Sequence, residues 1–201
     1  AMSRQSLVSI CIASYNHARF LAATLDSALA QTYENFEIIV VDDGSTDDSL
    51  AIAEGFAARH PSVMRVFTHP GAANRGISAT INAAILSAKG EFVRLFSSDD
   101  LLYPDTLAAQ VAILGHDTSL AFVYGHVDFI DGAGRKLPGL GGADITKDRK
   151  PIHRLLATNP IPAVTVMARR ECLVRVGLFD ETLVYGDWEL WIRLLAHYRV
   201  G

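Results

Sequence analysis

Two adjacent carboxylates, Asp99 and Asp100, follow a short apolar run at residues 92–96 that has the length of a β-strand. The carboxyl ends of strands form the edge at which open α/β sheets bind their ligands. Neighbouring carboxylates repel each other unless a cation, a bound hydroxyl or a hydrogen-bond donor holds them. A divalent cation that bridges to a substrate phosphate is one such partner, whereas an acidic start of the next helix is the alternative. These residues therefore predict either a metal-assisted phosphate site or a charged helix start.

A second acidic turn follows the apolar run at residues 37–41, where Asp42 and Asp43 stand side by side. Ser45 with Asp48 resembles a capping box, which predicts that a helix begins at this turn. Capping does not explain Asp42 and Asp43, because they precede the cap at the end of the strand. We therefore treat this pair as a second candidate for ligand contact.

Two further segments combine polar side chains with a change of periodicity. The apolar run at residues 8–12 ends in the turn Ala13-Ser14-Tyr15-Asn16, where Asn16 is the candidate N-cap of the next helix. Near the other end of the sequence, Asp187 opens an amphipathic stretch that continues to Leu195. An aspartate at this position is typical of an N-cap, and it is also a carboxylate placed at the start of a helix.

The elements that must position these residues alternate regularly in the first half of the chain. Four strand-like runs are each followed by a helical pattern, which predicts an α/β fold with a mostly parallel sheet. Gly90 is the expected C′ residue of the third helix. The second half changes to a mixed pattern with a surface loop at residues 137–150. Its expected elements are strands at 121–124, 127–130 and 164–168, a turn at 131–134, and a short helix at 170–176 that ends at Gly177.

Composition limits the possible function. The 201 residues are 50% hydrophobic, which fits one domain with a substantial core. A net charge of -4 without a Lys/Arg cluster argues against nucleic acid as a partner. Cys11 and Cys172 lie far apart in apolar segments and read as reduced core thiols. Without a signal peptide or an apolar run of about 18–20 residues, we expect a cytoplasmic protein.

Five motifs together resemble a known family. They are SYN at 14–16, VVDDGSTDDS at 40–49, NRG at 74–76, SSDD at 97–100 before YPD at 103–105, and GDWELWIRL at 186–194. This order resembles the family 2 inverting glycosyltransferases over nearly the whole chain. The resemblance implies the GT-A fold, a Rossmann-like three-layer sandwich with a smaller mixed part on the acceptor side. It implies a single domain with a nucleotide-binding half at 1–115 and an acceptor-binding half at 116–201. Because the sequence stops soon after the last helical pattern, we expect a C-terminally trimmed form of a longer protein that is peripheral to the membrane if it touches one.

The resemblance also implies roles for the nucleotide site. Asp43 matches the position that reads the uracil ring, with Asp42 beside it as support, because a carboxylate suits the ring N–H donor. The segment Ala13 to Asn16 matches the cradle of base and ribose, in which Tyr15 stacks on the ring. Arg75 matches a basic position near the diphosphate, and an exposed loop arginine is its alternative.

The SSDD turn matches the metal motif of the family, normally written Asp-x-Asp. Ser97 stands where many relatives place the first acid, so the assignment between the two acids stays open. We expect Asp100 to hold Mg²⁺ or Mn²⁺, and Asp99 to bind the ribose hydroxyls or share the metal. His197 is a further candidate ligand.

An inverting transfer needs one base that takes a proton from the acceptor hydroxyl. Asp187 matches that catalytic acid, and Glu189 is a weaker candidate. We expect Trp191 to lie in the core and leave Trp188 open between core and acceptor pocket.

The sequence thus favours a metal-dependent transferase that moves a sugar from a nucleotide-diphosphate sugar, UDP-linked by preference. Its acceptor would be a hydroxyl of a glycan, a lipid-linked or another compound. A catalytically inactive nucleotide-sugar or glycan-binding module of the same fold is the alternative. Neither the dinucleotide-binding G-x-G-x-x-G nor the P-loop G-K-S/T motif occurs at the required places.

Overall fold

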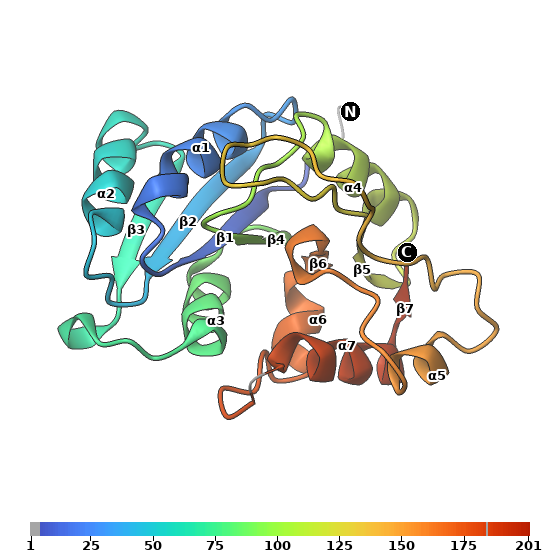
Figure 1. Ribbon diagram of the computed structural model, residues 1–201. Helices are drawn as coiled ribbons and strands as arrows, with labels where there is room; N and C mark the ends of the chain where they lie inside the picture. Colours follow the sequence, from blue (N-terminus) through green and yellow to red (C-terminus); the bar gives the residue numbers. More distant parts are fainter. Residues whose placement is uncertain (1–4, 184) are drawn as a thin grey trace.

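Seven strands form one mixed sheet in the computed structural model, which describes residues 5–183 and 185–201 (Figure 1). The strand order is β3-β2-β1-β4-β6-β5-β7. Only β6 runs antiparallel to its two neighbours, so the described sheet is mostly parallel. The strands are β1 (Val8–Ser14), β2 (Phe36–Asp42), β3 (Met64–Thr68), β4 (Phe92–Ser97), β5 (Leu120–Val123), β6 (Met167–Arg169) and β7 (Arg199–Val200).

The register places three motif-bearing strand ends beside one another. Ser14 at the end of β1 pairs with Asp42 of β2, and Ala13 pairs with Ser97 of β4. Because parallel strands end at the same edge, the three polar turns that follow them meet there. The strand order therefore explains how segments more than 80 residues apart in sequence come to share one site.

Helices cover both faces of the sheet and make the α/β three-layer arrangement (Figure 1). The core clusters group α1, α2 and α4 on one face, and α3, α6 and α7 on the other. The α-helices are α1 (Ala18–Leu29), α2 (Ser49–Arg59), α3 (Ile77–Ser87), α4 (Thr106–His116), α5 (Pro151–Leu155), α6 (Arg170–Arg175) and α7 (Gly186–His197), and the 3₁₀ turns are η1 (Pro70–Ala72) and η2 (Ala163–Thr165).

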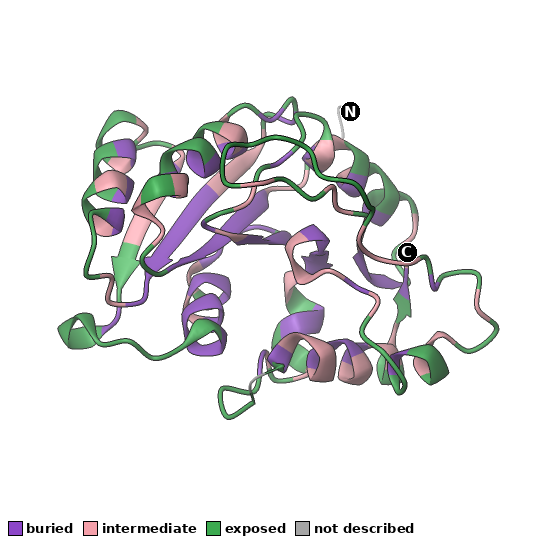
Figure 2. Ribbon diagram, in the orientation of Figure 1, coloured by how far each residue is buried: buried purple, intermediate pink, exposed green. Residues whose placement is uncertain are grey.

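Alternation along the central strands supplies both halves of the core. In β2, Ile38 and Val40 face the α1 layer, whereas Ile39 and Val41 face the α3 layer. All four are buried, as a parallel strand covered on both sides requires, and Figure 2 draws the centre of the sheet as buried. None of the helices in the described part of the chain has the length and apolar character needed to span a bilayer.

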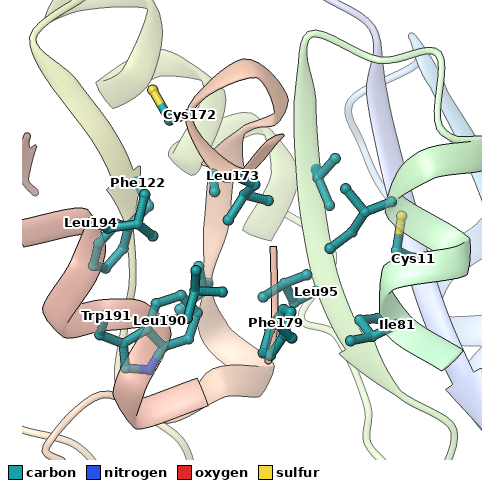
Figure 3. Packing of buried hydrophobic residues seen from close by; sticks show 14 of the residues in the cluster. Cys11, Ile81, Leu95, Phe122, Cys172, Leu173, Phe179, Leu190, Trp191 and Leu194 are labelled. Atoms are coloured by element: carbon teal, nitrogen blue, oxygen red, sulfur yellow. The ribbon is translucent and has the colours of Figure 1, made fainter. Parts of the chain in front are cut away.

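Trp191 anchors α7 on the sheet. Its side chain is fully buried, and its ring lies 5.2 Å from that of Phe122 and 6.3 Å from that of Phe179 (Figure 3). This confirms the core position expected for Trp191. The two cysteines, Cys11 and Cys172, are buried and unpaired, as expected from the sequence.

Several local predictions are wrong. The segment 127–130 forms no regular strand and pairs only through isolated bridges, Val127 to Gly141 and Ile130 to Lys136. Phe129 and Ile130 remain exposed, so the segment lacks the buried face that stabilises a strand. The strand expected at 164–168 is divided into η2 and β6. Gly90 is not a C′ residue, since α3 ends at Ser87; a Cβ there would lie 2.7 Å from the Leu7 carbonyl, so close backbone approach explains the glycine.

Candidate active site

The turn after β1 is held by the turn after β2. The Asn16 amide N–H donates to the Ser45 hydroxyl at 3.0 Å, and the Asn16 side-chain oxygen accepts from the Thr46 N–H at 2.8 Å. Asn16 has a φ of +54° and does not cap α1, because His17 occupies the N-cap position without a side-chain cap. Asp47 instead accepts from the Ala18 N–H at 2.9 Å. The N-cap expected at Asn16 is therefore wrong, and its amide group ties two turns together.

The Asp42 carboxylate accepts hydrogen bonds from its own turn. Its Oδ1 accepts the N–H groups of Gly44 and Ser45 at 3.1 and 2.9 Å, and its Oδ2 accepts the Ser45 hydroxyl at 2.6 Å. The capping box expected from Ser45 and Asp48 is wrong, since α2 begins at Ser49 without a side-chain cap. Asp42 is buried and acts as the internal brace of this turn.

Asp43, the next residue, holds a different loop. Its two carboxylate oxygens accept the backbone N–H groups of Arg75 at 2.7 Å and Gly76 at 3.0 Å. The His69 ring nitrogen lies 3.5 Å from Asp43 Oδ1 and 2.9 Å from the Thr80 hydroxyl. Asp43 thus joins the end of β2 to the loop before α3, where each carboxylate oxygen keeps a second lone pair.

Tyr15 and Arg75 stay accessible beside these bonds. Tyr15 is 44% exposed, so its ring is accessible to a stacking partner. The Arg75 guanidinium is 56% exposed and lies 3.9 Å from the Glu181 carboxylate. Ser14, between the two turns, is buried with a hydroxyl that has no partner among the described residues. Ala13 is buried one position earlier in β1.

The SSDD turn brings Asp99 and Asp100 next to the start of α1. The Ser97 hydroxyl donates to Asp99, and the His17 ring nitrogen lies 2.7 Å from the Ser98 hydroxyl and 3.8 Å from Asp99. Burial and the neighbouring Asp99 charge raise the pKa of Asp100. The two carboxylates thus repel each other, and a bound cation would offset this repulsion.

Arg94 is the buried cation of this region. It lies on β4 with only 3% exposure, and its Nη1 donates to the Leu95 and Val166 carbonyls, while its Nε has no partner in the described residues. Burial lowers the pKa of Arg94 to about 9, and the Asp100 charge opposes that shift. Sequence reasoning missed Arg94, because a charged residue inside an apolar strand gives no sign of what it faces.

Asp187 lines a cavity of about 260 Å³ together with the end of β4. Its carboxylate accepts a hydrogen bond of 2.9 Å from the Asn159 side-chain amide. The cavity walls come from α3, the end of β4, η2 and the start of α7. The lining residues are Ile77, Ser78, Ile81, Leu95, Phe96, Ser97, Ala163, Val164, Phe179, Gly186 and Asp187.

The start of α7 excludes the N-cap alternative for Asp187. Tyr185 is the N-cap residue, so Asp187 stands inside the first turn and is not the cap. Sequence reasoning also missed Asn159, which lies 28 positions away and carries no local signal.

Other polar candidates on α7 have different partners. Both carboxylate oxygens of Glu189 accept from the Arg193 guanidinium, and Glu189 does not line the cavity. His197 lies in the last helical turn, which is about 15 Å from Asp187 at 1.5 Å per residue. The Trp188 ring nitrogen donates to the Leu155 carbonyl, so Trp188 joins α5 to α7.

The residues of the SSDD turn suit a hard divalent cation. Among residues 5–183 and 185–201, no group of three or more His, Cys, Asp or Glu side chains has the arrangement of a complete metal site. Asp99 and Asp100 offer oxygen ligands from one turn, and substrate phosphates would complete the coordination of Mg²⁺ or Mn²⁺. The raised pKa of Asp100 fits this reading, since a bound cation would stabilise its ionised form.

The family model for "Glycosyl transferase family 2" matches residues 9–181, which include the turns after β1 and β2, the loop before α3 and the SSDD motif. The chain belongs to glycosyl transferase family 2. This finding confirms the family that the sequence motifs resembled. The matched residues thus include the ends of β1, β2 and β4, where the candidate site lies.

Curated relatives of this family 2 chain include an uncharacterized glycosyltransferase of Rickettsia typhi, 34% identical over 193 residues that cover 94% of this chain and 58% of the relative. The chondroitin synthase of Escherichia coli is 37% identical over 123 residues, covering 61% of this chain and 17% of that protein. The chain spans 31% and 58% of the length of the first two curated relatives.

Solved structures show the same fold. A mannosyltransferase from Pyrobaculum calidifontis, in complex with GDP-Man and Mn²⁺, matches with a TM-score of 0.74 and 24% identity, covering 99% of this chain and 55% of that one. TarS 1–349 of S. aureus, in complex with UDP, matches with a TM-score of 0.74 and 25% identity, covering 96% and 56%. The family 2 chain therefore has the GT-A fold that the motifs predicted.

Proposed function

We propose that this family 2 domain is an inverting glycosyltransferase that moves a sugar from a nucleotide-diphosphate sugar to a hydroxyl acceptor. The observation that supports it most is the shared cavity of Ser97 and Asp187. Ser97 begins the turn that carries Asp99 and Asp100, so the cavity lined by Asp187 reaches the start of the turn that holds the carboxylate pair.

The nucleotide end of the donor would lie over the interlocked turns. Asp43 would read a ring N–H with the lone pairs that its two loop amides leave free. Tyr15 would stack on the base, and Asp99 would bind the ribose hydroxyls. The exposed Arg75 would lie close to the diphosphate. We infer UDP as the preferred nucleotide, and the solved UDP complex of TarS supports this choice.

Asp99 and Asp100 would hold Mg²⁺ or Mn²⁺. Such a cation offsets the negative charge of the departing diphosphate. The solved complex of the mannosyltransferase with GDP-Man and Mn²⁺ supports the choice of a divalent cation for this fold. Buried Arg94 would remain behind Asp100 as a fixed positive charge in the same region.

Asp187 would take the proton of the acceptor hydroxyl as its oxygen attacks the anomeric carbon. The Asn159 amide donates to Oδ2, which leaves Oδ1 to accept that proton and fixes the plane of the carboxylate. The cavity is mostly apolar, so it would exclude water that competes with the acceptor. We further propose that residues 1–115 bind the nucleotide and residues 116–201 bind the acceptor.

Replacing Asp187 with Asn tests the assigned base. The variant keeps an oxygen that accepts from Asn159, so the fold and donor affinity should stay within about threefold, while the transfer rate should fall by about 10²- to 10⁴-fold. The measurement is release of UDP from a panel of UDP-sugars with a glycan acceptor mixture. Glu189→Gln is the control, because Glu189 faces Arg193 instead of the cavity. Full turnover by Asp187→Asn would place the base elsewhere.

A further inference from the structure

A second concave surface lies around α5 and the segment before it. Its volume is about 740 Å³, within the range of about 300–1,000 Å³ that is usual for ligand pockets. We call this surface the basic hollow. Its lining residues are Asp148, Arg149, Lys150, His153 and Arg154.

The basic hollow is positive in an acidic chain. Its three cations and one carboxylate give +2 with His153 neutral, whereas the whole chain carries -4. The carboxylate is already used, since Arg154 lies 3.5 Å from Asp148. In the described structure, no acidic group lies within 4.0 Å of the charged nitrogens of Arg149 or Lys150, and both residues are exposed. Unpaired cations gathered in a concavity favour an anionic ligand.

Its position connects the basic hollow to the candidate base. Helix α5 packs beside α7, as Figure 1 shows, and the Trp188 ring nitrogen donates to the Leu155 carbonyl at the end of α5. Four residues further on, Asn159 donates to Asp187. One short segment therefore carries both the cations and the amide that orients the base.

The donor phosphates have a different place. Asp99 and Asp100 at the end of β4 form the metal side of the proposed donor site, and Asp187 meets that side through the cavity that it shares with Ser97. Asp187 also accepts a hydrogen bond from Asn159, which follows α5 by four residues. An anion in the basic hollow would thus belong to the second substrate.

We propose that the basic hollow binds a phosphate group carried by the acceptor and so directs an acceptor hydroxyl to Asp187. This inference rests on the proposed function and adds the chemical class of its acceptor, a phosphorylated glycan. A membrane surface fits less well, because the cations line a concavity and α5 has only five residues. Arg149 and Lys150 are the two cations free to hold the phosphate.

The test is calorimetric titration of glycerol 3-phosphate into the whole chain, with UDP and Mn²⁺ present to fill the donor site. Each exposed cation near a phosphate contributes about a fivefold change in affinity, so Arg149→Gln with Lys150→Gln should weaken binding about 25-fold. The matched control is Arg59→Gln with Lys89→Gln, which removes the same charge at exposed positions far from α5. The control should bind as the unaltered protein does.

Each outcome decides the inference. Absence of glycerol 3-phosphate binding while UDP binds, or equal weakening in both double variants, would overturn it. Binding of phosphatidylglycerol vesicles that depends on Arg149 and Lys150, without binding of glycerol 3-phosphate, would assign the surface to a membrane and would also overturn it. Failure of UDP to bind would contradict the proposed donor site alone. Comparison of glycerol 3-phosphate affinity in the two double variants would still show whether the phosphate binds at Arg149 and Lys150.

Discussion

At the scale of single residues, the neighbouring aspartates Asp42 and Asp43 accept hydrogen bonds from different segments. Asp42 accepts three hydrogen bonds from its own turn, whereas Asp43 accepts two amides from a loop more than 30 positions away. The sequence predicted the importance of both, because neither was explained by helix capping. It did not predict that the two aspartates have different partners, since the position of the loop at residues 70–76 depends on tertiary packing.

Asp100 should reduce stability at neutral pH. Its pKa is raised by burial and by Asp99, so the folded protein binds this proton more tightly than the unfolded chain does. The resulting loss of stability begins above the unfolded pKa of about 3.9 and is complete above the folded pKa. Asp100→Asn should therefore raise the melting temperature at pH 7, in a thermal melt without metal.

The same variant should lose the metal response. Mn²⁺ with UDP should stabilise the unaltered protein, and metal-linked UDP affinity should fall at least about tenfold in Asp100→Asn. Asp26→Asn, at an exposed position on α1, is the control and should change neither property. A lower melting temperature for Asp100→Asn, with an intact metal response, would show that the SSDD turn is only a charged helix start.

At the scale of elements, the site depends on loops that lock at strand ends. The loop at residues 70–76 passes so close to the turn after β2 that a Cβ on Gly44 would lie 2.4 Å from the Ala72 carbonyl. Gly44 also has a φ of +75°, a conformation that favours glycine. The glycine therefore allows Asp43 to reach its two loop amides.

Gly44→Ala should displace that loop and weaken nucleotide binding. Gly71→Ala is a matched control, because Gly71 has a φ of +70° and open space around its Cβ position. Both variants should lose about 1–2 kcal/mol of unfolding free energy from the backbone conformation, and Gly44→Ala should lose more because of its clash. Chemical denaturation and UDP titration measure the two effects. Equal UDP affinity in the two variants would contradict the role of the loop.

In helix α7, apolar periodicity predicted the buried face but not the first residue of the helix. Its apolar spacing predicted the buried Trp191, and the structure confirms it. The cap reading of Asp187 was wrong because the N-cap of the helix is Tyr185, two residues earlier. Contacts with Asn159 and Leu155 come from a segment whose path the sequence does not show, so the roles of Asp187 and Trp188 had remained open.

At the scale of the whole molecule, the alternation of apolar runs predicted the α/β class and the parallel part of the sheet. The mixed part was harder to predict, because its strands are short and β6 has only three residues. The segment 127–130 has strand-like residues yet pairs only through isolated bridges, and its Phe129 and Ile130 stay exposed. The site could be placed at the carboxyl edge from topology, whereas the basic hollow required the packing of α5 on α7.

We propose that this edge of the sheet forms a metal-assisted site for a UDP-sugar. Calorimetric titration of UDP, with GDP, ADP and dTDP as comparisons and each with and without Mn²⁺, tests it most directly. We predict that UDP binds more tightly than the other three and that its affinity rises at least about tenfold with Mn²⁺. No binding of any nucleotide to the folded protein, or equal binding with and without Mn²⁺, would contradict the account.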